Sequence, residues 1–214
     1  MVTSRVFLLS PANCGGARAR QVLSPRAVFA LAQRLRSADG APLGELYAFI
    51  SGLYFRGKLT YAQRFAAPPE PDNVTIGGGV HIITPNAGLR PPDVLVTVAD
   101  IQAFATADVH PNNPLFTVPL ERSARVLHRE LGPDCDVVLL GSIASPKYLD
   151  VLVTVFGDRL RFPLDFVGRG DMSRGGLLLR KADEGAELEY VPVLGATRRG
   201  VRPPKLEKRQ NGKR

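Results

Sequence analysis

Residues 6–9 (VFLL) form a short apolar run that changes abruptly into the small, polar loop 10–16 (SPANCGG). The same change recurs at residues 80–88, 137–147 and 166–176. Because helical patterns separate these runs, the sequence predicts an α/β fold with a mostly parallel central sheet flanked by helices. Loops that follow parallel strands gather at one edge of such a sheet, which is where ligands bind in open α/β folds.

The remaining elements are expected from helical spacing and turn residues. Ser24 and Pro25 have the types typical of an N-cap and a first helical position, and predict a helix that ends at Gly40. Residues 43–65 predict a helical region interrupted at Gly52. Further expected elements are a loop at 66–79, an extended piece at 93–97, helices at 101–107, 120–131, 145–156 and 171–182, and strands at 160–162 and 187–193.

Length and charge separate a body from a tail. The chain has 214 residues and 44% hydrophobic content, which predicts one α/β domain over residues 1–197 with no membrane span or secretion signal. Residues 198–214 hold eight Lys or Arg and one Glu, so seven of the eight net positive charges lie there. This segment is predicted to be a disordered tail, which either attracts phosphate backbones or only aids solubility.

Cysteines and histidines argue against a disulfide framework and a metal site. Cys14 and Cys135 are the two cysteines, and we expect both to stay reduced in the cytoplasm. Together with three histidines they show no metal-ligand spacing. The sequence therefore predicts no metal, no organic cofactor and no membrane partner.

The loop at 10–16 is the strongest candidate site. Gly15 and Gly16 let backbone amides approach a ligand, and Arg18 follows where a helix begins. The spacing matches neither the dinucleotide fingerprint nor the Walker loop. An ordinary strand-to-helix turn is the alternative. Cys14 is either a nucleophile or, more simply, a small buried thiol.

Two other segments carry polar groups of interest. Asp171 lies between Arg169 and Arg174, where it either orients water or caps a helix. Residues 141–148 offer Ser142 and Lys147 to a phosphate or base edge.

Residues 54–58 (YFRGK) interleave aromatic and basic side chains, as surfaces that stack bases and hold phosphates do. Helical spacing also allows Tyr54 to be a core residue.

Three stretches carry a resemblance to a known family. Residues 53–62 (LYFRGKLTYA) resemble the Leu-Phe-Arg-Lys-Ala-Arg-x-Tyr-Ala helix of the YaaA-like proteins. Residues 82–93 are similar to that family's strand, turn and Gly-Leu-x-x-Pro segment, and residues 141–152 to its Gly-x-x-Tyr-x-x-x-Leu step. This resemblance implies DNA-linked work in repair or nucleobase metabolism. The first loop also resembles the water-positioning loop of the uracil-DNA glycosylase superfamily, whose asparagine would correspond to Asn13.

These features predict a DNA-binding, glycosylase-like enzyme that hydrolyses the N-glycosidic bond of an altered base. Asn13 would position water, and Asp171 would stabilise positive charge on the sugar or activate the water. Expected substrate contacts are Ser10, Cys14, Gly15, Gly16, Tyr54, Asn86, Ser142 and Ser173. Expected phosphate contacts are Arg18, Arg56, Lys58, Lys147, Arg169 and Arg174.

Two alternatives stay open at this point. One is a nucleoside or nucleotide N-glycosidase, or a base-exchange transferase, that acts on free small molecules. The other is a non-catalytic DNA-binding accessory protein.

Overall fold

A six-stranded sheet in the order β4-β3-β1-β6-β7-β8 forms the centre of the protein. The structure, a computed structural model, describes residues 3–197, 200–201, 203–204 and 206. Strands β3, β1, β6 and β7 are parallel, while β4 and β8 pair antiparallel at the two edges. The strands are β1 (Arg5–Leu9), β3 (Val80–Thr84), β4 (Gly88–Arg90), β6 (Asp136–Leu140), β7 (Leu160–Pro163) and β8 (Tyr190–Pro192). The predicted fold class is confirmed.

The two innermost strands are buried on both faces. Every residue from Val6 to Leu9 is inaccessible to solvent, as are Val137 to Leu140. Continuous apolar runs of this kind suit a parallel sheet covered on both sides. Leu9 pairs with Leu140 on one side and with Ile82 on the other. The carboxyl ends of the three strands are therefore nearly level, and the loops that follow them leave from the same edge.

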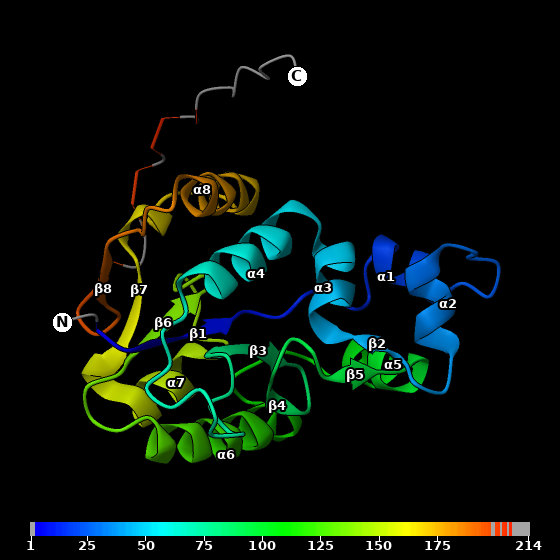
Figure 1. The fold of residues 1–214 in the computed structure, drawn as a ribbon, viewed down its shortest axis with the longest axis horizontal. Helices are drawn as coiled ribbons and strands as arrows, with labels where there is room; N and C mark the ends of the chain where they lie inside the picture. The colour runs from blue at the N-terminus through cyan, green and yellow to red at the C-terminus, as the bar shows by residue number, and fades with distance from the viewer. Residues whose placement is uncertain (1–2, 198–199, 202, 205, 207–214) are drawn as a thin grey trace.

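Helices cover both faces of the sheet (Figure 1). Helices α4 (Leu53–Phe65) and α8 (Asp171–Glu184) lie on one face, and α6 (Pro114–Glu130) and α7 (Leu149–Phe156) on the other. A smaller group lies beyond the carboxyl end of β1 (Figure 1). This group consists of α1 (Ala17–Leu23), α2 (Ala30–Arg36), α3 (Leu43–Ser51), α5 (Val98–Thr106) and the short ribbon of β2 (Ala41–Pro42) with β5 (Leu95–Val96).

Several predicted elements are confirmed, and the break at Gly52 is the sharpest of them. Gly52 adopts a φ of 63° between α3 and α4, a backbone conformation that favours glycine. Gly185 likewise ends α8 in the left-handed conformation. In the described part of the chain, no helix is long and apolar enough to cross a membrane.

The predicted starts of two helices are wrong for the same reason. Ser24 is the C-cap of α1 rather than the N-cap of the next helix, which begins only at Ala30. Ser145 and Pro146 lie in a loop, and α7 begins at Leu149. In both places a Ser-Pro pair begins a turn, which its residue types favour as much as a helix start.

Three other boundaries also differ from the prediction. Helix α6 begins at Pro114, where Asn113 caps it by accepting a hydrogen bond from Leu115 N–H. The helix then continues through Pro119. The apolar run before the fourth loop belongs to a 3₁₀ turn, η2 (Leu164–Phe166), rather than to a strand. The final strand is only three residues long. The predicted tail, 198–214, lies largely outside the described residues.

Helices α4 and α8 cross at two facing glycines. A Cβ atom on Gly57 would lie 2.6 Å from the carbonyl oxygen of Gly175, and one on Gly175 would lie 2.7 Å from the Cα of Tyr54. The two backbones therefore approach as closely as main chains allow. Because α4 carries Tyr54 and Lys58 and α8 carries Asp171, this contact fixes where these side chains lie.

The crossing gives the first prediction. Gly57→Ala places a methyl group against the main chain of α8, which cannot give way as a side chain does, and we expect the protein to lose about 2 kcal/mol of unfolding free energy. Gly176→Ala is the matched control, since its Cβ would meet only Leu206 Cδ1 at 3.5 Å. That variant should gain up to about 1 kcal/mol from helix propensity. Urea unfolding measures both, and equal effects would contradict the argument.

Candidate active site

A cleft of about 840 Å³ opens at the carboxyl edge of the parallel strands. Each of the four loops contributes to its lining, with Cys14 from the first, Pro85 from the second, Ser142 from the third and Asp171 from the fourth. The prediction that these loops meet at one edge is confirmed.

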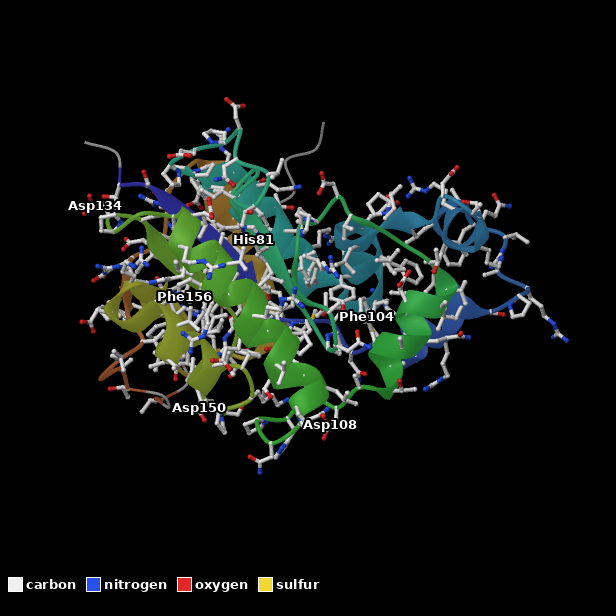
Figure 2. All side chains as sticks on the ribbon, turned by 90° about the horizontal axis from the view of Figure 1, so that it is seen from below. His81, Phe104, Asp108, Asp134, Asp150 and Phe156 are labelled. Atoms are coloured by element: carbon white, nitrogen blue, oxygen red, sulfur yellow. The ribbon has the colours of Figure 1, made fainter. Side chains whose placement is uncertain are left out.

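Another part of the cleft wall comes from the smaller group of helices. Phe104 of α5 and Asp108 of the loop that follows it belong to this wall, and both are labelled in Figure 2.

Lys58 lies at the floor of the cleft, and only 1% of its surface is exposed. Its Nζ donates to the main-chain oxygen of Ser10 at 2.6 Å and lies 2.8 Å from the Oγ of the same residue. The amine also lies 4.6 Å from the ring centre of Tyr54 and 4.7 Å from that of Phe55. Lys58 is therefore buried at the cleft rather than on an exposed surface, and its predicted role as a phosphate contact stays a prediction.

Burial changes the acid–base behaviour of Lys58. The loss of solvent lowers its pKa to about 7, with Asp171 opposing this effect and Arg174 adding to it. In the described part of the chain, no carboxylate lies within ion-pair distance of its Nζ. A lysine in these surroundings exchanges its proton near neutral pH, as a catalytic base must.

The end of β6 closes over Ser10. A Cβ atom on Gly141 would lie 2.7 Å from the hydroxyl of Tyr148 and 2.9 Å from the Cβ of Ser10, so only glycine fits there. The Tyr148 hydroxyl donates to the main-chain oxygen of Ser142 and accepts from its N–H, both at 3.0 Å. Burial raises the pKa of Tyr148 to about 12. Tyr148 thus keeps its proton and stays in place beside the serine.

Tyr54 adds a second buried hydroxyl to the cleft wall. In the described part of the chain its hydroxyl has no hydrogen-bond partner, and burial raises its pKa. A nearby guanidinium, that of Arg174, partly opposes the shift. A buried hydroxyl without a partner costs free energy, which a polar ligand in the cleft would recover.

The two residues predicted to be catalytic lie at the rim. Asn13 is exposed, and its Oδ1 accepts a hydrogen bond from Gly15 N–H at 3.0 Å. Asp171 is the first residue of α8, and its carboxylate lies 3.7 Å from the Nη1 of Arg174. Both line the same cleft. The structure therefore brings them to one site, at its mouth rather than at its floor.

Cys14 lines the cleft but is not an activated thiol. The residue is buried, and burial raises its pKa to about 11. Its sulfur faces the main-chain oxygen of Ala12 at 3.8 Å and has the buried hydroxyl of Tyr47 nearby. This environment matches the simpler interpretation of a packed thiol.

Some predicted residues lie outside the cleft because other contacts hold them. Asn86 borders a separate cavity of about 690 Å³ and donates to the main-chain oxygen of Ala103 at 3.1 Å. Gly16 is the N-cap of α1, which has only seven residues. Ser173 lies in α8 and accepts a hydrogen bond from Arg169 at 3.4 Å.

Most of the predicted phosphate-binding arginines are engaged with main-chain oxygens. Arg18 donates to Phe49, Arg169 to Asp165 and Arg174 to Phe166. Arg56 is exposed on α4 and does not line the cleft. Of the predicted phosphate-binding residues, Lys147 is the exposed cation in the cleft lining.

The sequence did not predict Tyr148 as a site residue, and it did not predict that Lys58 is buried. A signal for Lys58 was present, because it follows Tyr54 by four positions and precedes Tyr61 by three, which places it on the buried stripe of α4. Tyr148 belongs to the stretch 141–152 that resembles the Gly-x-x-Tyr-x-x-x-Leu step, but that pattern does not encode its contacts, which depend on the close approach of the two strand ends.

Among the described residues, no group of three or more His, Cys, Asp or Glu side chains is placed to hold a metal ion. The lining of the cleft instead offers hydroxyl, amide, amine and carboxylate groups. Groups of these kinds can bind and orient an organic ligand and move protons.

Comparisons with models of protein families, with curated proteins and with solved structures find no match to this chain. The resemblance to the YaaA-like proteins and to the uracil-DNA glycosylase superfamily stays a prediction.

The buried amine of Lys58 gives the second prediction. Its pKa in the fold lies below the ordinary value of 10.5, so the unfolded chain binds more protons between pH 7 and pH 10.5. Stability therefore rises with pH in this window. Between pH 7 and pH 9 the wild-type protein should gain about 2 kcal/mol relative to Lys58→Met, because Lys58 is already half deprotonated in the fold at pH 7.

Denaturant unfolding at pH 6, 7, 8 and 9 measures this difference. The control is Lys147→Met, the same change at an exposed lysine, which should follow the wild-type pH dependence. A difference between the wild-type protein and Lys58→Met that does not change with pH would contradict the assignment.

Proposed function

We propose that this protein hydrolyses the N-glycosidic bond of an altered base, with one nucleotide held in the cleft. The observation that carries the proposal is the convergence of the loops after β1, β3 and β6 and of the start of α8 on a single cleft of about 840 Å³. Small-molecule sites of about 300–1,000 Å³ are typical of proteins, and one nucleotide fits within that range.

The rim supplies the groups that this reaction needs. Cleavage builds positive charge on the sugar, which the exposed carboxylate of Asp171 stabilises as it forms. The Oδ1 of Asn13 is engaged with Gly15 N–H, so we assign the amide nitrogen of Asn13 to the attacking water. Lys147 lies at the same cleft and suits a phosphate of the bound nucleotide.

Altered DNA is the substrate that the charge distribution of the sequence supports. Seven of the eight net positive charges lie in residues 198–214, and such a segment adds attraction to a phosphate backbone without sequence choice. A base in a duplex must first be extruded, at a cost of about a few kcal/mol that is least for a damaged or mismatched base. We place this DNA-binding enzyme in the cytoplasm, which agrees with two free cysteines.

A specific observation supports a second candidate, a nucleoside or nucleotide N-glycosidase that acts on free small molecules. Arg18, Arg169 and Arg174 donate to main-chain oxygens and help to hold the fold. A duplex would therefore meet fewer uncommitted cations near the cleft than the sequence predicts, whereas a free nucleoside needs none of them.

The third prediction concerns the chemistry at the rim. Incubation of the full chain with a panel of DNAs that carry uracil, alkylated, deaminated or oxidised bases should release free base from at least one of them. Asp171→Ala and Asn13→Ala should each lower the single-turnover rate about 10²-fold or more, because each removes a group that acts in the transition state. Asp165→Ala is the control, as a carboxylate outside the cleft lining.

Free base is measured by chromatography, and folding of each variant by circular dichroism. Unchanged release in both rim variants would dismiss the roles of Asn13 and Asp171. Deletion of residues 198–214 separates the two substrates. Loss of activity on DNA, with a shallower dependence on salt, supports the DNA enzyme, while unaltered turnover of a free nucleoside supports the second candidate. Salt-sensitive binding without base release from any substrate would leave only a non-catalytic DNA-binding protein.

A further inference from the structure

We propose that Ser10 is a nucleophile activated by Lys58, and that the floor of the cleft is an acyl-transfer centre acting on a carboxylic ester or amide. This activity goes beyond N-glycosidic cleavage, because it uses the buried floor of the cleft and needs neither Asn13 nor Asp171.

The geometry of the pair is that of a nucleophile and its base. The Oγ of Ser10 and the Nζ of Lys58 are 2.8 Å apart, within the range of about 2.6–3.2 Å expected for such a pair. Both residues line the cleft. The Nζ is also held by the main-chain oxygen of Ser10 at 2.6 Å, which leaves its lone pair free to accept the hydroxyl proton when the amine is neutral.

Neighbouring groups hold the serine in position. Ser10 is the first residue after β1, and its N–H donates to the main-chain oxygen of Leu140 at 3.2 Å. The Tyr148 hydroxyl and Gly141 pack against it, where even one extra methyl group would collide. A nucleophile fixed to a strand end in this way does not need to be ordered when substrate binds.

Burial of Lys58 favours the neutral amine that a base requires, because it removes the amine from solvent. Asp171 of α8 opposes this effect, as do the ring faces of Tyr54 and Phe55, whereas Arg174 of α8 adds to it. Tyr148 keeps its proton and adds no charge at neutral pH. The resulting pKa of Lys58, about 7, leaves a large neutral fraction at physiological pH.

The reaction balances with water as the second substrate. The Oγ of Ser10 bonds to the carbonyl carbon while its proton moves to the Nζ of Lys58. The bond from that carbon to the alcohol or amine breaks, and the leaving group takes the proton from Lys58. Water then attacks the acyl-serine and gives its proton to Lys58. The carboxylic acid leaves, and Ser10 recovers its proton.

The experiment uses the full chain and a fluorophosphonate probe, which phosphonylates activated serines. We expect one adduct, located on Ser10 by peptide mass spectrometry, with a rate that rises between pH 6 and pH 8. Ser10→Ala should abolish labelling, and Lys58→Met and Lys58→Arg should slow it about 100-fold or more, since neither side chain accepts a proton at these pH values.

Ser51→Ala is the matched control. Ser51 is another serine in the cleft wall, and among the described residues it makes no hydrogen bond to Lys58. This variant should be labelled at the wild-type rate. A further variant, Ser10→Cys, tests the pair by a second reaction. Its thiol should react with iodoacetamide faster than the thiol of the double variant Ser10→Cys/Lys58→Met. Circular dichroism of both variants shows whether they are folded.

Absence of the Ser10 adduct in the wild-type protein would overturn the proposal. Labelling of Lys58→Met at the wild-type rate, with circular dichroism showing that it is folded, would overturn it equally. Hydrolysis of p-nitrophenyl acetate that is lost in Ser10→Ala would support it further.

Discussion

The close approach of α4 and α8 at Gly57 and Gly175 is the constraint on which the site depends. A wider crossing would leave the space between the helices to solvent or to larger side chains, and would move Tyr54 and Lys58 away from the groups of α8. The two helices instead cover the same face of the sheet (Figure 1). The distances at Gly57 and Gly175 place their backbones in close contact. The amine of Lys58 is therefore sealed between the ring of Tyr54 and the end of β1.

Sealing an amine in this way costs free energy, because a buried charge is expensive unless it is paired or neutralised. The Nζ of Lys58 lies within hydrogen-bond distance of two oxygen atoms of Ser10 and over two aromatic rings. Within the described part of the chain, no carboxylate lies within ion-pair distance of it. A leucine or methionine of similar size would fill the same volume without this penalty. Ionisable groups with perturbed pKa values concentrate at functional sites. The free-energy cost of burying this amine therefore favours a chemical role for Lys58 over a structural one.

The sequence was sufficient to predict the sheet and the location of the cleft, since apolar runs such as 6–9 and 137–140 define buried parallel strands and topology then brings their loops together. It was insufficient for the site itself. Arg174 resembles a phosphate ligand in the sequence, but η2 presents a carbonyl oxygen of Phe166 to it in the fold. Ser24 and Ser145 have the residue types of helix caps, yet the next turn of helix begins later in each case. These outcomes depend on contacts between distant segments, which local spacing does not encode.

The loop after β1 connects the two parts of the cleft. Ser10 lies at the floor against Lys58, and Asn13, three residues further on, lies exposed at the rim, held by its own turn with Gly15. A ligand long enough to reach the floor must pass the rim. It would therefore meet Asn13 at the rim and Ser10 at the floor, although both residues belong to one short loop. Ser10 and Lys58 at the floor are buried, which suits proton transfer, whereas the rim is exposed and carries the charges of Lys147 and Asp171, which suits recognition of a polar ligand. The hydrolytic chemistry proposed here would need both conditions within a few residues, and this loop, fixed at one end by the parallel sheet, would supply them.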